Sequence, residues 1–218
     1  MSSRPAASSD SYYYANRLGR IVLLATEEVI GRTALKAMLN LSGQHHFINN
    51  YPPNNLDRGF SFTELSAIIN ALERMYGPQA SRSLGMRIGR AAFRYGLKEF
   101  GASLGVADLA FRLLPFGIKL KIGVESVFGV FNKFSDQTGH IEETEETMLW
   151  HVERCPICWG RSVGRPVGFM ATGALQEGLF WVSGGKDFEV SEITCIAQGD
   201  ARGTFVIQKR PLEQTDLP

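Results

Sequence analysis

The hydrophobic pattern divides the chain into a helical part and a mixed part. Up to about residue 134, apolar residues recur every three or four positions, which is the period of an amphipathic α-helix. This spacing predicts helices over residues 26–41, 65–76, 79–100 and 106–132. Beyond about residue 141, apolar and polar residues alternate, as they do in strands with one buried face. This alternation predicts strands over residues 145–153, 188–197 and 204–209, and a helix rich in small residues over residues 166–182.

Local signals mark where several of these elements begin and end. Ser61 and Glu64 have the spacing of a capping box, in which each side chain pairs with a free backbone amide at a helix start. Gly31 can break the first helix, and Gly77-Pro78 is expected to end the second. A hinge over residues 115–117 is expected to split the fourth helical segment into two.

The boundaries predict one globular unit of the α+β class. We expect a disordered tail over residues 1–18, because the opening segment lacks the apolar run of a secretion signal. A helical part then covers residues 19–134, and a mixed α/β ligand-binding part covers residues 135–212. The longest apolar region, residues 104–131, is interrupted by five charged residues, so no membrane span is predicted. The net charge of +1 lacks the basic excess of a nucleic-acid binder. We expect a cytoplasmic protein.

The helix over residues 79–100 has four distinct faces. Two faces are apolar, and a groove of small residues lies between them, where another helix or a flat ligand can approach the backbone. The fourth face is basic and carries Arg87, Arg90, Arg94 and Lys98. A solvated surface is one interpretation of this face. The other is an anchor for the carboxylates of a ligand, which suit the forked guanidinium group.

Aromatic residues are candidates for a small-molecule site. An apolar cavity with few polar anchors is typical of such sites, although a packed core is the alternative interpretation. The candidates for the cavity wall are Phe111, Phe116, Phe128, Phe131, Trp150, Trp159 and Phe169.

The three cysteines suggest either a metal site or buried structural thiols. Cys155 and Cys158 have the CxxC spacing that can hold one metal ion, but no second CxxC is present. Cys195 would be the third ligand of a zinc ion, and His151, Glu192 or Asp200 the fourth. An exchanging dithiol and structural thiols remain alternatives. Glu192 and Cys195 face opposite sides of a regular strand, so joint ligation requires a bulge between them.

Enzyme motifs are absent from the sequence. It contains no dinucleotide-binding, phosphate-loop, zinc-protease or nucleophile-elbow pattern. His45 and His46 lie in an Asn-rich segment without a nearby nucleophile pattern, and we expect them to be exposed and without a catalytic role.

The second half of the chain resembles the 4-vinyl reductase domain family, whose members include hydrocarbon-binding proteins. The similarity covers residues 141–211. It rests on Cys-Pro-Ile-Cys-Trp-Gly from Cys155, Pro-Val-Gly-Phe-Met-Ala-Thr-Gly from Pro166, Trp-Val-Ser-Gly-Gly from Trp181, and Phe-Glu-Val-Ser-Glu-Ile-Thr-Cys from Phe188. The helix with Arg-Ile-Gly-Arg-Ala-Ala-Phe-Arg-Tyr-Gly from Arg87 is similar to the helical half that often precedes this domain.

The resemblance implies a fold shared with TRAPP subunits and similar to nitric-oxide sensor domains, with dimers formed through the helices. It implies roles in vinyl reduction during bacteriochlorophyll synthesis or in sensing aromatic hydrocarbons. In the sensor members, three cysteines and a glutamate hold a zinc ion, and their positions here are Gly168, Glu192, Cys195 and Gly203. Two of the four are glycine, so Cys155 and Cys158 would have to supply the replacement thiols.

The sequence therefore favours a non-catalytic carrier or sensor that binds a hydrophobic small molecule, either a tetrapyrrole or an aromatic compound. We expect a homodimer that reports to a partner protein. Arg87, Arg90 and Arg94 would pair with the carboxylates of the ligand. The alternative is a vinyl reductase of bacteriochlorophyll synthesis, or its accessory subunit, although no signature of a hydride donor is visible. A third interpretation is a structural subunit of a larger assembly.

Overall fold

Helices and antiparallel strands alternate along the chain in the computed structural model, which describes residues 12–102 and 109–212. The helices are α1 (Asn16–Ile30), α2 (Arg32–Leu41), α3 (Phe62–Phe100), α4 (Leu109–Leu113), α5 (Phe116–Phe134) and α6 (Phe169–Ser183). The strands are β1 (Tyr13–Ala15), β2 (Arg58–Ser61), β3 (Thr138–Glu143), β4 (Thr147–Arg154), β5 (Phe188–Thr194) and β6 (Gly203–Pro211). Short 3-10 helices cover His45–Phe47 and Ile196–Gln198. The α+β class is confirmed.

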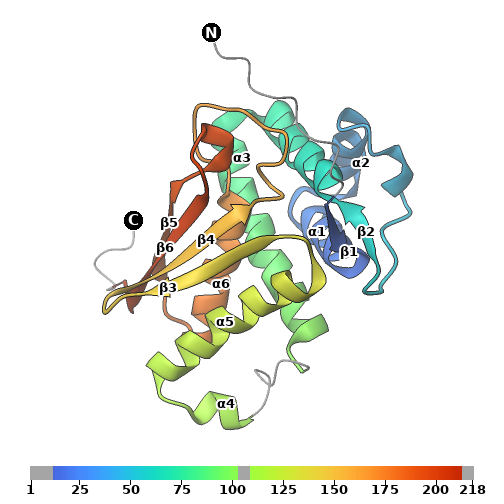
Figure 1. The fold of residues 1–218 in the computed structure, drawn as a ribbon. Coiled ribbons are helices and arrows are strands. Elements are labelled where there is room, and N and C mark those ends of the chain that lie inside the picture. Colours follow the sequence, from blue (N-terminus) through green and yellow to red (C-terminus); the bar gives the residue numbers. More distant parts are fainter. Residues whose placement is uncertain (1–11, 103–108, 213–218) are drawn as a thin grey trace.

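A four-stranded antiparallel sheet forms one side of the molecule. Its strand order is β3-β4-β6-β5, and α5 and α6 pack beside it. The other side holds α1, α2 and the two-stranded sheet β1-β2, with the long α3 running between the two sides (Figure 1). Two large clusters of buried side chains, one around α1 to α3 and one between the sheet, α5 and α6, form most of the core.

Small residues let α3 and α6 pack backbone against backbone. A Cβ atom added at Gly89 would lie 1.9 Å from the carbonyl oxygen of Met170, and one added at Gly173 would lie 2.0 Å from that of Met86. Real Cβ atoms are never so close to another heavy atom, so glycine is required at both positions. The small-residue groove predicted on α3 is therefore occupied by α6 at Gly85 and Gly89, whereas a Cβ atom added at Gly96 would meet nothing within 4 Å.

Most predicted helix boundaries agree with the structure. Gly31 separates α1 from α2 with φ 83° and ψ 156°, a conformation that disfavours residues with a side chain. Gly77 has φ 74° and ψ 169° and forms a kink, after which α3 continues from Pro78. The capping box of Ser61 and Glu64 is present at the start of α3. Pro115 precedes α5, so the predicted hinge is also present.

The N-terminal boundary was placed too late. Residues 13–15 form β1 and pair with β2, and α1 begins at Asn16, so residues 12–18 do not belong to a tail. The apolar pattern over residues 26–41 also predicted only the end of α1. Apolar residues of the first turns, such as Leu18 and Ile21, are buried against α3 and extend the helix ten residues further upstream. Residues 1–11 lie outside the described part of the chain.

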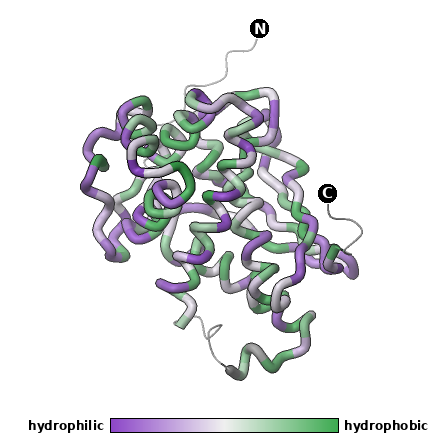
Figure 2. Tube along the Cα trace, turned by 180° about the vertical axis from the view of Figure 1, so that it is seen from behind, coloured by the Kyte–Doolittle hydropathy of each residue, from purple (hydrophilic) through white to green (hydrophobic). Residues whose placement is uncertain are grey.

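The mixed part follows the predicted order, with one strand added. Residues 138–143 form β3, which pairs with β4 as an antiparallel hairpin. The connection from α2 to β2 lies at the outer edge of the molecule and is largely hydrophilic (Figure 2). None of the described helices is both long and apolar enough to cross a membrane.

Candidate ligand cavity and thiol–carboxylate cluster

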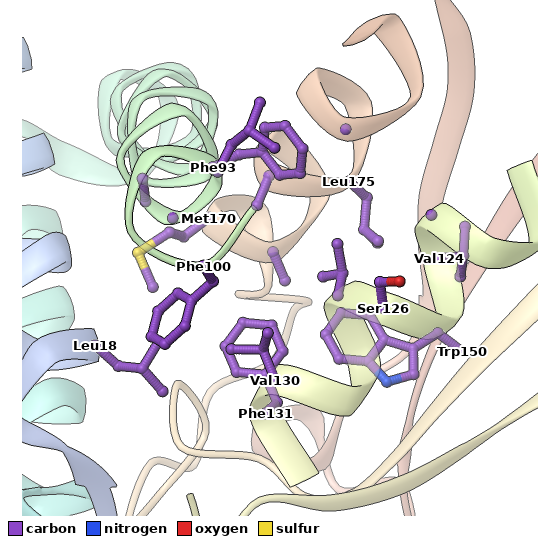
Figure 3. Close-up of a pocket in the computed structure, with 18 of the residues that line it drawn as sticks. Leu18, Phe93, Phe100, Val124, Ser126, Val130, Phe131, Trp150, Met170 and Leu175 are labelled. Carbon is purple, nitrogen blue, oxygen red and sulfur yellow. The ribbon is translucent and has the colours of Figure 1, made fainter. Parts of the chain in front are cut away.

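An apolar cavity of about 180 Å³ lies where α1, α3, α5 and α6 meet the inner face of the sheet. Figure 3 shows Leu18 of α1, Phe93 and Phe100 of α3, Val130 of α5 and Leu175 of α6 arranged around it. Its remaining walls come from β4, β6, the segment that follows β4, Tyr14 of β1 and Gln137 just before β3. The cavity thus lies at the junction of the two parts of the chain, where no single helix stripe in the sequence could reveal it.

Aromatic side chains form the wall on the side of the sheet. The ring of Phe131 stacks on Trp150 with centroids 6.0 Å apart, and Phe205 lies 5.5 Å from Trp150 on a neighbouring strand. All three line the cavity. Stacked and tilted arrangements at these distances are favourable for aromatic pairs, and they would also be favourable for an aromatic ligand.

The few polar groups of the cavity wall are uncharged. Tyr14 donates a hydrogen bond from its hydroxyl to Oε1 of Gln137 at 2.8 Å, and both residues are buried. Burial raises the pKa of Tyr14 well above its usual value, with a smaller contribution from Cys155. Ser126 and Cys155 also line the cavity, but no Asp, Glu, Lys, Arg or His is among its described lining residues. A charged group placed here would lose its hydration without gaining a partner.

Of the aromatic residues proposed from the sequence, Phe131 and Trp150 line the cavity. Phe128 contacts Trp150 edge to face at 6.5 Å without reaching the cavity wall. The other four pack elsewhere: Phe111 on Trp181, Phe116 on Phe188, Trp159 between Tyr12 and Phe62, and Phe169 under the guanidinium of Arg82.

The basic face of α3 does not point into the cavity. Arg90 donates a hydrogen bond to Gln176, and Arg94 forms ion pairs with Glu28 and Glu177. Arg87 is exposed. None of the three arginines lines the cavity, so the structure does not place them where they could anchor a ligand held there.

A second candidate site joins two cysteines and a carboxylate. The sulfur atoms of Cys158 and Cys195 are 3.6 Å apart, and ligand atoms of Cys158, Glu192 and Cys195 all lie within 4.8 Å of one another. The pairing register of β5 shifts between Glu192 and Thr194. This irregularity is the bulge that the sequence analysis required for the two side chains to meet.

The geometry and the donor types of this cluster fit a zinc ion. Two sulfur ligands at ~2.3 Å from a tetrahedral zinc lie ~3.8 Å apart, close to the observed separation of the two sulfurs. Burial and the neighbouring Cys195 raise the pKa of Glu192 to about 8. Hydrogen bonding to Cys155 and burial raise the pKa of the Cys158 thiol, and hydrogen bonding to Cys158 together with burial raises that of Cys195. A cation would offset the cost of ionising these buried groups.

The other suggested ligands lie outside the cluster. His151 contacts Thr204 and Glu142, and Asp200 accepts a hydrogen bond from the backbone amide of Cys195. Gly168 adjoins the cluster, because a Cβ atom there would lie 2.8 Å from Oε1 of Glu192. A cysteine at this position, as the family resemblance implies for the sensor members, would therefore lie beside Glu192.

Comparisons with known proteins identify the fold. No family model and no curated protein matches the sequence. An Fe(II) unliganded H-NOX protein variant from K. algicida matches with a TM-score of 0.58 and 14% identity, over 92% of this chain and 97% of that one. An H-NOX protein from S. oneidensis in the Fe(II)NO state matches with 0.55 and 13%, over 91% and 99%. An oxygen-binding H-NOX domain related to soluble guanylate cyclases matches with 0.53 and 10%, over 89% and 94%. The chain has an H-NOX-like fold, as the expected similarity to nitric-oxide sensor domains implied.

The residues of the cavity do not fit a haem, the group named for one structure of this fold. None of the four histidines lines the cavity, and no cationic side chain among the described lining residues could pair with the carboxylates of a haem. The ~150 Å³ of an engineered cavity holds a benzene molecule, so about 180 Å³ corresponds to one substituted ring and not to a macrocycle of four. The shared fold therefore does not imply a shared ligand.

Proposed function

We propose that this chain is a non-catalytic binding domain for an uncharged aromatic molecule the size of one substituted ring. The observation that carries the proposal is the cavity itself, with its volume of about 180 Å³ and its apolar, aromatic wall, whose described residues include no charged side chain. An apolar ligand entering such a cavity gains dispersion contacts without having to bury a polar group of its own.

Two alternatives from the sequence are less well supported. A tetrapyrrole would exceed the volume of the cavity, and its carboxylates would find no cation among the described lining residues. Vinyl reduction would require a hydride donor and a proton source at the site. The polar groups of the described wall residues are the paired hydroxyl of Tyr14, the amide of Gln137, the indole N–H of Trp150, Ser126 and Cys155, which form no acid–base pair.

Phe131 and Phe128 provide a matched test of the binding site. Both lie on α5 and both contact Trp150, but only Phe131 lines the cavity. Toluene binding would be measured by isothermal titration calorimetry for the wild type, Phe131→Leu and Phe128→Leu. Loss of one aromatic contact is worth ~0.5–1.5 kcal/mol, so Phe131→Leu should weaken the Kd about 2- to 12-fold. Phe128→Leu should change the Kd by less than twofold. Absence of toluene binding to the wild type, or equal losses in both variants, would contradict the proposal.

A second proposed function is the binding of a zinc ion by Cys158, Glu192 and Cys195. It is supported by the separation of the two sulfurs and by the bulge that brings Glu192 to them. Redox exchange by these thiols is less well supported, because burial and a raised pKa suppress the reactive thiolate. Elemental analysis after dialysis against zinc should give one zinc ion per wild-type chain. It should give none for Cys195→Ser.

The predicted homodimer and the partner protein remain proposals. Mass measured by light scattering behind a size-exclusion column, at two protein concentrations tenfold apart, tests self-association. A monomer mass at both concentrations would contradict the dimer.

A further inference from the structure

The segment that follows β4 belongs to both candidate sites. Cys155, Pro156 and Ile157 line the cavity, and Cys158, the next residue, belongs to the thiol–carboxylate cluster. These residues are buried, with Cys155 8% exposed and Cys158 2% exposed, so the segment cannot move at one site without repacking at the other.

A second connection runs through Glu192 to the start of α6. Oε2 of Glu192 accepts a hydrogen bond of 2.7 Å from the backbone amide of Gly168, the N-cap residue of α6. Helix α6 supplies a large part of the cavity wall, including Met170 and Leu175 (Figure 3). Phe205, which also lines the cavity, lies beside Gly168, because a Cβ atom at Gly168 would be 2.6 Å from its ring. Glu192 therefore orients one end of a cavity wall.

We propose that metal binding by Cys158, Glu192 and Cys195 tightens the binding of the aromatic ligand in the cavity, and that ligand binding tightens metal binding by the same factor. This coupling rests on both proposed functions above. A metal ion would join the segment after β4, the end of β5 and, through Glu192, the start of α6 at one point. Fixing these elements beforehand lowers the ordering cost of ligand binding.

The reciprocity is a thermodynamic requirement. If zinc changes the affinity for the cavity ligand by some factor, the ligand must change the affinity for zinc by the same factor. Coupling between linked sites typically amounts to 5- to 150-fold, and we expect at least about fivefold here because two separate connections join the sites.

Calorimetric titration of the full chain tests the coupling directly. Toluene is titrated into protein stripped of metal by a chelator and into the same protein loaded with one equivalent of zinc. Zinc is then titrated with and without saturating toluene. We expect the Kd for toluene to fall at least about fivefold in the zinc form, and the Kd for zinc to fall by the same factor with toluene. In Cys195→Ser, checked for folding by circular dichroism, the Kd for toluene should no longer respond to zinc.

The outcomes separate the coupling from the functions on which it rests. Equal or weaker toluene binding in the zinc form would overturn the coupling and leave ligand binding intact. Zinc binding without any toluene binding would overturn the coupling together with the proposed ligand. Toluene binding without zinc binding would overturn the coupling together with the metal site and leave the cavity proposal standing.

Discussion

Gly89 offers a quantitative test of how closely α3 and α6 pack. Its Cα faces the backbone of α6, where an added Cβ atom would lie 1.9 Å from the oxygen of Met170 and 2.8 Å from the nitrogen of Ala174. Both neighbours are main-chain atoms, so no side-chain rotation can relieve the clash. Gly89→Ala therefore requires the two helices to separate along a contact that connects both halves of the core.

The expected cost follows from this geometry. Overpacking of a well-packed core typically costs ~1–3 kcal/mol, and a clash between two backbones belongs at or above the upper end of that range. In a chain of this size ~1 kcal/mol corresponds to a change of about 2–4 °C in Tm, so Gly89→Ala should lower Tm by roughly 6–12 °C.

Gly129 on α5 is the matched control. It is also helical, but an added Cβ atom meets nothing within 4 Å. Here alanine should stabilise the helix by ~0.5–1 kcal/mol and raise Tm by a few degrees. Thermal unfolding of both variants is followed by circular dichroism at 222 nm. A Tm for Gly89→Ala equal to that of the wild type, or raised as in Gly129→Ala, would refute the backbone contact.

Three further predictions concern local features. In the metal-free folded protein, Glu192 has a pKa of about 8, against 4.5 ordinarily, and is protonated below that pH. The stability that it contributes is therefore fully present below pH 4.5 and is lost as the pH rises through 8. Urea unfolding at pH 6, 7 and 9 should show this loss in the wild type and a flatter profile in Glu192→Gln. Ser61→Ala removes the capping box of α3 and should cost about 1 kcal/mol in the same assay, whereas Ser61→Thr should retain most of the stability. Gly31→Ala places a side chain at φ 83° and ψ 156° with nothing within 4 Å, so its cost of ~1–3 kcal/mol should be purely conformational and should persist in Gly31→Ser.

Local signals in the sequence were sufficient for most of the fold. A capping box, a glycine with positive φ and a proline at a helix start each act within a few residues, so their consequences can be predicted without knowing the tertiary structure. The boundary at residue 18 shows the limit of this approach. Strand β1 has only three residues, and it is held by pairing with Arg58–Ser61, more than forty positions away.

Which residues form the candidate site is decided by tertiary contacts, and the hydrophobic periodicity of the sequence does not predict these contacts. Phe128 and Phe131 lie on one helix three residues apart and both touch Trp150, yet only one of them reaches the cavity. Which of two neighbouring aromatics lines a cavity is decided by the crossing of α5 with the sheet and α6. Arg94 is likewise held by Glu28 and Glu177, partners 66 and 83 positions away, which the helical stripe could not identify.

The thiol–carboxylate cluster could be predicted from the sequence only in part. The CxxC spacing and the pair Glu192 and Cys195 were visible in the sequence, and so was the condition for their meeting, a bulge in the strand. The structure has that bulge, and it brings Cys158 and not Cys155 into the group of three. Cys155 instead lies on the cavity wall.

The fold and the side chains contribute differently to the choice of ligand in this H-NOX-like chain. In this chain α1, α3, α5 and α6 enclose a cavity of about 180 Å³ against the sheet, and aliphatic and aromatic residues line it. A haem would need room for its macrocycle and cations for its carboxylates, and the described lining residues provide no cation. An uncharged ring needs only dispersion contacts and the exclusion of water, which this wall offers. The ligand is therefore better inferred from the composition of the cavity than from the fold that surrounds it.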